Sequence, residues 1–216
     1  MRIAYQGEPG AYSEAAALLF SKHAETLPCK TFDEVFDVVL HKRSTHGIVP
    51  MENSIGGTIH RNYDLLVDHE IPITGEVELD VVHCLQALPG TKIEDIKIVY
   101  SHQQALAQCE RYLKELGVTV EAVYDTAGGA KLVAEQRLNN AAALASRRAA
   151  DPGALGRGVP GSPVPGGGHP NPGGRRPGDE REPLHGVHAG AVLQQPRPPR
   201  RLGARAGGLT PPMLGS

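Results

Sequence analysis

The 216-residue chain is poor in aromatic side chains, which make up 4% of it, and it contains no tryptophan. All nine Phe and Tyr residues precede residue 125, so the large apolar side chains are not spread evenly along the chain. Cysteine is scarce as well. The three cysteines, Cys29, Cys84 and Cys109, are an odd number without the spacing of metal ligands. We interpret them as reduced core thiols of a protein in a reducing compartment.

Several functional signatures are also missing from the sequence. No apolar run approaches the ~18 residues that a membrane-spanning helix needs, and no charged-then-apolar leader precedes Ile3. There is no glycine-rich dinucleotide fingerprint, no Walker motif and no Cys/His metal pair. We therefore predict a soluble cytoplasmic protein with no metal, no cofactor and no membrane partner.

Residues 151–216 differ in composition from the rest of the chain. They contain 13 Pro and 16 Gly, no Lys and no aromatic residue, and their net charge is +4, against −6 for residues 1–150. Such a segment is expected to bury too little apolar surface to fold. Three interpretations compete: a disordered arm, a nucleic-acid-binding segment, and translation past a frameshift in a GC-rich gene. We favour the frameshift, and we predict no nucleic-acid partner because the positive charge is thinly spread and lacks interleaved aromatic residues.

Strand and helix patterns alternate through residues 1–75. A short apolar strand at Arg2–Gln6 precedes a helix over 14–23, for which Ser13 is the expected N-cap. A strand around Leu27–Lys30 precedes a capping box, Thr31 to Glu34, and a helix with apolar residues at i, i+3, i+4 and i+7. A strand at Gly47–Val49 follows, ended by Pro50. This alternation predicts a parallel sheet.

The same unit recurs in residues 76–150. An extended apolar stretch, Ile71–Leu88, is interpreted as a crossover strand that carries the chain into a second lobe, with the boundary near Gly75. Strands are then expected over 96–100, 118–124 and 141–145, and helices over 104–116 and from Asp125 to about Gln136. We therefore predict an α/β fold of two lobes with a ligand at the carboxyl ends of the strands, between the lobes.

The loop after the third strand carries the densest set of polar groups. Glu52, Asn53, Ser54 and Thr58 follow an apolar strand, and Gly56-Gly57 allows backbone N–H groups to approach a ligand closely. Such a loop suits a small hydroxylated anion. An ordinary strand-to-helix turn would use the same residue types, so the loop alone does not decide between these alternatives.

Four motifs in order resemble the prephenate dehydratase family. They are Tyr5-Gln6-Gly7-Glu8-Pro9-Gly10-Ala11-Tyr12-Ser13, Pro50-Met51-Glu52-Asn53-Ser54 with Gly57-Thr58, Ser101-His102-Gln103-Gln104-Ala105-Leu106-Ala107-Gln108-Cys109, and Asp125-Thr126-Ala127 with Ala142-Ala143-Leu144-Ala145-Ser146. The resemblance covers about the first 150 residues. It implies a two-lobed fold like that of type II periplasmic binding proteins, and conversion of prephenate to phenylpyruvate, water and carbon dioxide in phenylalanine biosynthesis, without a cofactor.

The resemblance also implies which residues form the site. Asn53, Ser101 and Gln108 are the candidate catalytic residues. The candidate substrate-binding residues are Ser13, Glu52, Ser54, Gly57, Thr58, Asp125 and Thr126. For Glu52 an acid and a structural carboxylate are alternatives, and we favour the structural role. His102 at a helix start is not assigned a catalytic role. The partner is a small dianion, prephenate or arogenate, and the oligomeric state is left open.

The sequence departs from the family after Ala150. The family returns to the first lobe through a segment containing Thr-Arg-Phe, whose threonine it implicates as the proton donor to the leaving hydroxyl, and this chain has no Thr-Arg-Phe. A regulatory ACT module is missing too. We therefore predict lobes at residues 1–75 and 76–150, a truncated second lobe, no return strand, an exposed sheet edge and a tail, 151–216, without a fold. A non-catalytic binder of a small anion is the alternative function.

Overall fold

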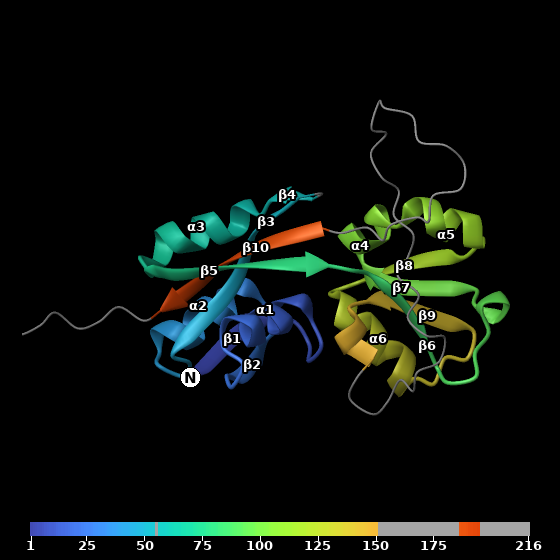
Figure 1. The fold of residues 1–216 in the computed structure, drawn as a ribbon, viewed down its shortest axis with the longest axis horizontal. Helices are drawn as coiled ribbons and strands as arrows, with labels where there is room; N and C mark the ends of the chain where they lie inside the picture. Colours follow the sequence, from blue (N-terminus) through green and yellow to red (C-terminus); the bar gives the residue numbers. More distant parts are fainter. Residues whose placement is uncertain (55, 151–185, 195–216) are drawn as a thin grey trace, which may run out of the picture.

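Two sheets, each flanked by helices, form the two lobes of the molecule (Figure 1). The computed structural model describes residues 1–54, 56–150 and 186–194. The first sheet has the strand order β2-β1-β3-β10-β5, with β4 paired to β3, and the second has the order β6-β9-β7-β8. The predicted α/β fold with two lobes is thereby confirmed.

The first sheet combines parallel and antiparallel pairs. Its strands are β1 (Arg2–Gln6), β2 (Glu25–Cys29), β3 (His46–Asn53), β4 (Gly57–Thr58), β5 (Ile73–Val81) and β10 (Gly186–Gln194). The pairs β1–β2 and β1–β3 are parallel, whereas β10 is antiparallel to both β3 and β5. The helices of this lobe are α1 (Tyr12–Phe20), α2 (Phe32–Leu40) and α3 (His60–His69).

Strand β10 contradicts the predicted loss of the return strand. It fills the position between β3 and β5, and Val192 and Leu193 are 0% exposed. The predicted exposed sheet edge, which assumed that the return strand is missing, was therefore wrong. The 13 prolines of residues 151–216 do not exclude this strand, because none lies within Gly186–Gln194. The prediction that the tail has no fold otherwise concerns residues 151–185 and 195–216, which lie outside the described residues.

Strand β3 also runs further than predicted. It continues through Pro50 to Asn53, and the register with β10 shifts between Ala189 and Gly190, opposite Glu52 and Pro50. A bulge is a position where a sheet tolerates proline, because a ladder hydrogen bond is already interrupted there. The chain then folds back as β4, which pairs Thr58 with Glu52. The strand therefore extends past Val49, where the prediction ended it, as far as Asn53.

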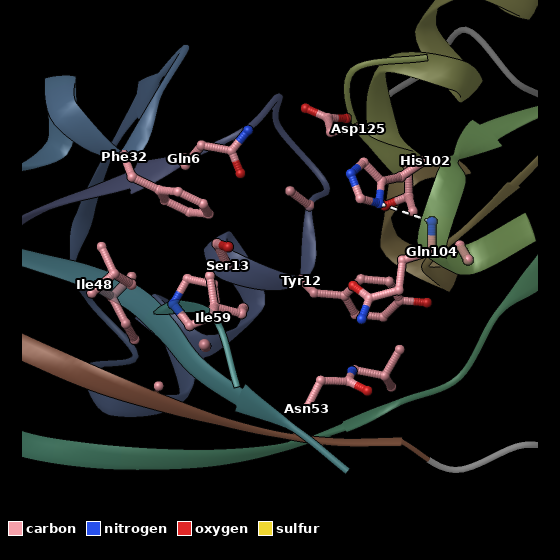
Figure 2. A pocket seen from close by; sticks show the side chains of 18 of the residues that line it. Gln6, Tyr12, Ser13, Phe32, Ile48, Asn53, Ile59, His102, Gln104 and Asp125 are labelled. Atoms are coloured by element: carbon pink, nitrogen blue, oxygen red, sulfur yellow. Dashed lines mark hydrogen bonds between the residues drawn. The ribbon is translucent and has the colours of Figure 1, made fainter. Parts of the chain in front are cut away.

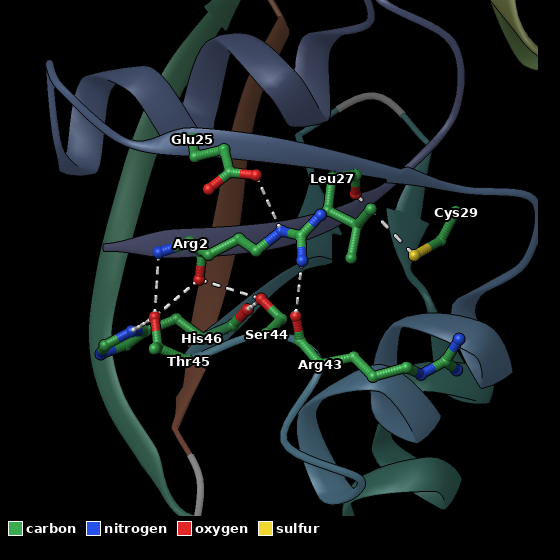
Figure 3. Close-up of polar contacts among 8 residues, drawn as sticks. All are labelled: Arg2, Glu25, Leu27, Cys29, Arg43, Ser44, Thr45 and His46. Atoms are coloured by element: carbon green, nitrogen blue, oxygen red, sulfur yellow. Dashed lines mark hydrogen bonds and ion pairs between the residues drawn. The ribbon is translucent and has the colours of Figure 1, made fainter.

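Helix starts are only partly as expected. Thr31 caps α2 by accepting a hydrogen bond from the backbone N–H of Glu34, as predicted. Ser13 does not cap α1, because this helix begins earlier, at Tyr12, with Ala11 at the cap position and no side-chain cap. The start of the chain is held by polar contacts: Thr45 and Ser44 donate to the carbonyl of Arg2 and join β1 to the residues before β3 (Figure 3).

The second lobe is continuous in sequence. Its strands are β6 (Cys84–Ala87), β7 (Ile98–His102), β8 (Thr119–Val123) and β9 (Ala141–Ala145), and its α-helices are α4 (Gln103–Gln108), α5 (Glu110–Leu116) and α6 (Thr126–Glu135). The single helix predicted over 104–116 is two helices that meet at Cys109. The predicted crossover strand is also two strands, and the lobe boundary lies at Val82 and His83 and not near Gly75, because β5 belongs to the first sheet throughout.

The lobes are packed against each other on the side of α1 and α6. One apolar cluster combines Ile3 and Tyr5 of the first lobe with Ala130 and Ala143 of the second. Gly10 has φ +91°, and a Cβ there would lie 2.6 Å from Cα of Ala149. Glycine is therefore required at this contact. Within the described part of the chain, no helix has the length and apolar character needed to cross a bilayer.

Candidate functional site

A cavity of about 500 Å³ lies between the two lobes (Figure 2). In this view Gln6, Phe32 and Ile48 of the first lobe lie on one side, and His102 and Gln104 of the second lie on the other. The cavity is located where the prediction expected a ligand, at the carboxyl ends of β1 and β7.

Four helices begin at the wall of this cavity. The lining includes Tyr12 and Ser13 of α1, Thr31 and Phe32 at the start of α2, Gln104 of α4, and Asp125 and Thr126 at the start of α6. The side chains of Thr31, His102 and Asp125 cap α2, α4 and α6, respectively, whereas α1 has no side-chain cap. Helix starts carry partial positive charge and backbone N–H donors. Their convergence makes the cavity favourable for an anion.

Asn53 is held at the lobe interface by its own loop. It is 1% exposed, and its Oδ1 accepts a 2.7 Å hydrogen bond from the backbone N–H of Gly56. The same oxygen accepts a 3.4 Å hydrogen bond from Nε2 of Gln108 in the second lobe. A Cβ on Gly56 would overlap the side chain of Gln104, also of the second lobe. The polar loop predicted from the sequence therefore meets α4 across the cavity.

Gln108 and Asn53 belong to a longer series of polar contacts. Oε1 of Gln108 lies 2.9 Å from Nε2 of His83, and Nδ1 of His83 lies 3.0 Å from the hydroxyl of Tyr12. That hydroxyl also donates to the carbonyl of Val82 at 2.8 Å. Burial lowers the pKa of His83 below its usual value. The imidazole is consequently neutral at neutral pH.

A second polar group joins the lobes at Asp125 and Glu8. Asp125 accepts hydrogen bonds from the backbone N–H groups of Gly128 and Glu8, and burial raises the pKa of Asp125. The Glu8 carboxylate accepts from the Tyr124 hydroxyl at 2.8 Å and from Lys131 at 3.1 Å. The loop after β1 is thereby fixed to the start of α6.

The charges on the cavity wall are few. Lys30 and Asp33 line it from the first lobe and Asp125 from the second. Asp33 forms an ion pair with Arg61, and both oxygens of Asp125 accept backbone hydrogen bonds. Among the residues that line the cavity, Lys30 therefore supplies the positive charge that can face a bound anion.

The structure brings together five of the predicted site residues. Ser13, Asn53, Gln108, Asp125 and Thr126 all line the cavity. Their assignment to substrate binding or catalysis stays a prediction.

The other five predicted residues are not part of the cavity wall. Ser101 is 0% exposed within β7, and its hydroxyl donates to the carbonyl of Leu144, so it does not face the first lobe as predicted. Glu52, Ser54, Gly57 and Thr58 are exposed. Glu52 pairs with Thr58 through the backbone of a hairpin, and the structural role that we favoured for its carboxylate stays a prediction.

Several cavity residues were not predicted. Tyr12 lies directly before Ser13 in the motif that runs from Tyr5 to Ser13. Because α1 begins at Tyr12, this side chain lies in the first turn of the helix and reaches the cavity. His83 lies between two strands that the sequence did not separate, so no pattern marked it. Gln104 and Tyr124 belong to helix and strand ends that reach the cavity only through the packing of the lobes.

Metal ligation finds no support among the described residues, where no group of three or more His, Cys, Asp or Glu side chains is arranged to hold an ion. Cys29, Cys84 and Cys109 are buried and free. Burial raises the pKa of Cys109 to about 12, which makes this thiol a poor nucleophile.

The comparisons with known proteins agree with the geometry. The family model "Prephenate dehydratase" matches residues 3–155. A protein of Arabidopsis thaliana named "Arogenate dehydratase/prephenate dehydratase 2, chloroplastic" is 53% identical over 150 residues, which are 69% of this chain and 39% of that protein. The cytoplasmic location predicted for this chain stays a prediction, since that relative is chloroplastic.

Two solved structures share the fold. A prephenate dehydratase of Arthrobacter aurescens in complex with L-Phe has a TM-score of 0.70 at 21% identity, over 92% of this chain and 61% of that one. A structure titled "GqqA- a novel type of quorum quenching acylases" has a TM-score of 0.74 at 29% identity, over 99% of this chain and 67% of that one.

This chain spans about two fifths of the length of the curated relatives that it matches. The residues that match the family model include strands β1 to β9, the four helix starts and the amide pair Asn53 and Gln108. The family match covers well over half of the chain, and the residues that carry it surround the cavity. The chain therefore belongs to the prephenate dehydratase family.

Proposed function

We propose that this chain binds prephenate or arogenate in the cavity between its lobes and converts it by loss of water and carbon dioxide. The observation that carries the proposal is the meeting of Asn53 and Gln108 from opposite lobes in a cavity surrounded by helix starts. The family match and the names of the relatives support the reaction class.

The proposed reaction needs a defined pose more than a strong nucleophile. The bond between the ring and its carboxylate breaks to release carbon dioxide, its electron pair moves into the ring, and the ring hydroxyl leaves as water after taking a proton. Aromatisation supplies the driving force, so the protein must align the two leaving groups and favour proton transfer.

The residues on the wall suit the parts of such a substrate. The uncapped start of α1, the Ser13 hydroxyl and Lys30 offer donors and positive charge for a carboxylate. The amide of Gln108 offers N–H groups to a hydroxyl or carboxylate oxygen. Thr126 adds a hydroxyl group from the second lobe. Phe32, Ile48 and Leu79 provide apolar surface for the ring.

Turnover of prephenate by the full chain tests the proposal. We expect phenylpyruvate to form faster than in a protein-free control at the same pH. The Gln108→Ala variant should lose about tenfold to a hundredfold of that rate, since a hydrogen bond to a charged ligand contributes roughly 1.5–3 kcal/mol. Gln136→Ala is the matched control, because Gln136 is an exposed glutamine at the end of α6. No phenylpyruvate from prephenate and no phenylalanine from arogenate above the control would refute the proposed activity.

Anion binding without turnover is the second candidate, favoured by one observation: the chain has no Thr-Arg-Phe segment. Titration calorimetry separates the two functions. A binder gives a saturable heat and returns prephenate unchanged, whereas an enzyme consumes it. Titration with arogenate in parallel tests which of the two substrates the cavity prefers.

A further inference from the structure

His83 lies at a position that neither the sequence motifs nor the proposed chemistry assigns. It occupies the crossover between β5 and β6, is 5% exposed, and lines the cavity. Its two ring nitrogens contact different lobes. Nδ1 contacts Tyr12 of α1, and Nε2 contacts Gln108 of α4.

The directions of these hydrogen bonds follow from one fixed donor. The backbone N–H of Gly56 can only donate, so the atom of Asn53 that faces it is the oxygen Oδ1. The group of Gln108 that approaches the same oxygen must also be a donor, which places its Nε2 toward Asn53. The oxygen of the Gln108 amide then faces His83.

The orientation of Gln108 determines the tautomer of His83. An amide oxygen only accepts hydrogen bonds, so Nε2 of His83 must carry a proton. In the neutral imidazole Nδ1 is then an acceptor. The Tyr12 hydroxyl lies 3.0 Å from Nδ1 and 2.8 Å from the Val82 carbonyl, so its single proton is shared between these two acceptors. From Gly56 to His83, each link in this series therefore has one donor and one acceptor.

We propose that His83 is a positioning residue of the cavity: as the Nε2–H tautomer it holds the Gln108 amide with its NH₂ group toward Asn53 and the bound ligand. Without the His83 proton the Gln108 amide can rotate by half a turn, which would set its oxygen against Oδ1 of Asn53 and against an anion. The consequence for an anionic ligand rests on the proposed function. The tautomer and the amide orientation do not.

Nitrogen-15 NMR of the full chain tests the tautomer directly. We expect His83 at neutral pH to be the Nε2–H tautomer, with a scalar coupling pattern that distinguishes protonated Nε2 from unprotonated Nδ1. The Nδ1–H tautomer would overturn the proposal, whether or not the chain binds any substrate.

Two substitutions then separate positioning from packing. His83→Gln places an amide NH₂ group near the original Nε2, whereas His83→Asn reaches only as far as Nδ1. We expect phenylpyruvate, as a stable anionic probe in titration calorimetry, to bind to His83→Asn about tenfold more weakly and to His83→Gln within about threefold of the unmodified chain. Equal losses in both variants, with equal melting temperatures, would indicate a packing role and overturn the proposal.

Tyr12→Phe supplies a further control. The aromatic ring that lies 5.6 Å from the His83 ring, edge to face, is kept in this variant, and only the hydroxyl is lost. We expect the Nε2–H tautomer to persist and phenylpyruvate affinity to fall less than in His83→Asn. If neither the unmodified chain nor any variant binds phenylpyruvate or prephenate, the proposed function fails, and the NMR result still decides the role of His83.

Discussion

The two lobes complete their sheets in different ways. The second lobe takes all four strands from Cys84–Ala145, a single continuous stretch. The first lobe takes five strands from Arg2–Val81, but β10, which separates β3 from β5, comes from beyond the second lobe. β3, the strand that carries Asn53, therefore depends on a segment that follows the second lobe in the sequence. We therefore expect substitutions in β10 to disturb the first lobe more than the second.

The largest effect is expected for Val192→Asp in β10. Val192 is 0% exposed and pairs with Ile48 on one side and Gly75 on the other, so the substitution buries a charge without a partner. We expect the free energy of unfolding to fall by more than about 4 kcal/mol. Hydrogen exchange should show lost protection in β3 and β5 and retained protection in β7 and β9.

Val120→Asp is the matched control for that experiment. Val120 is 45% exposed on β8, at the edge of the second sheet, so the same chemical change should cost less than about 1 kcal/mol. Loss of protection in both lobes of Val192→Asp would show that the lobes unfold as one unit. Unchanged protection in β3 and β5 would contradict the role of β10.

The next effect concerns Asn53, at the end of β3. Asn53→Ala removes the acceptor for Gly56 N–H and for Gln108. We expect the rate of phenylpyruvate formation, or the affinity for phenylpyruvate, to fall about tenfold to a hundredfold. Asn139→Ala, at an exposed asparagine in the turn before β9, should leave both unchanged. Equal behaviour of the two variants would remove Asn53 from the site.

Ser101→Ala should show the opposite balance of effects. The Ser101 hydroxyl bonds the Leu144 carbonyl inside the second sheet and lies away from the cavity. We expect a loss of about 1 kcal/mol in stability, measured by urea denaturation, and ligand affinity within about twofold of the unmodified chain. A large loss of turnover at unchanged stability would mean that Ser101 reaches the ligand, as the family resemblance implies.

Local sequence patterns predicted best the helices whose ends are determined by residues nearby in the sequence. The capping box of Thr31 and the apolar spacing after it determine α2, and Gly117 ends α5 in the left-handed conformation that glycine adopts readily. Asp125 caps α6 for the same kind of reason. The alternation of strands and helices was therefore evident up to Ala145, apart from the division of the crossover strand and of the 104–116 helix, and with it the location of the cavity at strand ends.

The missed features depend on contacts far along the chain. Composition averaged over 66 residues obscured the apolar sequence Ala189–Leu193 inside a segment rich in Pro and Gly. Pro50 stays within β3 because the bulge opposite Gly190 interrupts the ladder there, and that bulge requires β10. Ser101 was predicted at the site from a motif alone, and the sequence could not show which face of β7 its hydroxyl occupies.

The smallest effect is expected at Glu8, which joins the first lobe to Tyr124 and Lys131 of the second. Burial disfavours the Glu8 carboxylate, but hydrogen bonds from Tyr124 and Lys131 outweigh it and hold the pKa of Glu8 below its usual value. A carboxyl group with a lowered pKa in the folded state stabilises the fold above its usual pKa, and this contribution is lost as the pH falls through the lower folded value.

The difference in unfolding free energy between the unmodified chain and Glu8→Gln should be under about 1 kcal/mol at neutral pH and vanish in acid. Urea denaturation from neutral pH down to about pH 3 measures it, with Glu76→Gln on the exposed side of β5 as control, and a difference that grows toward acid would contradict the assigned contacts.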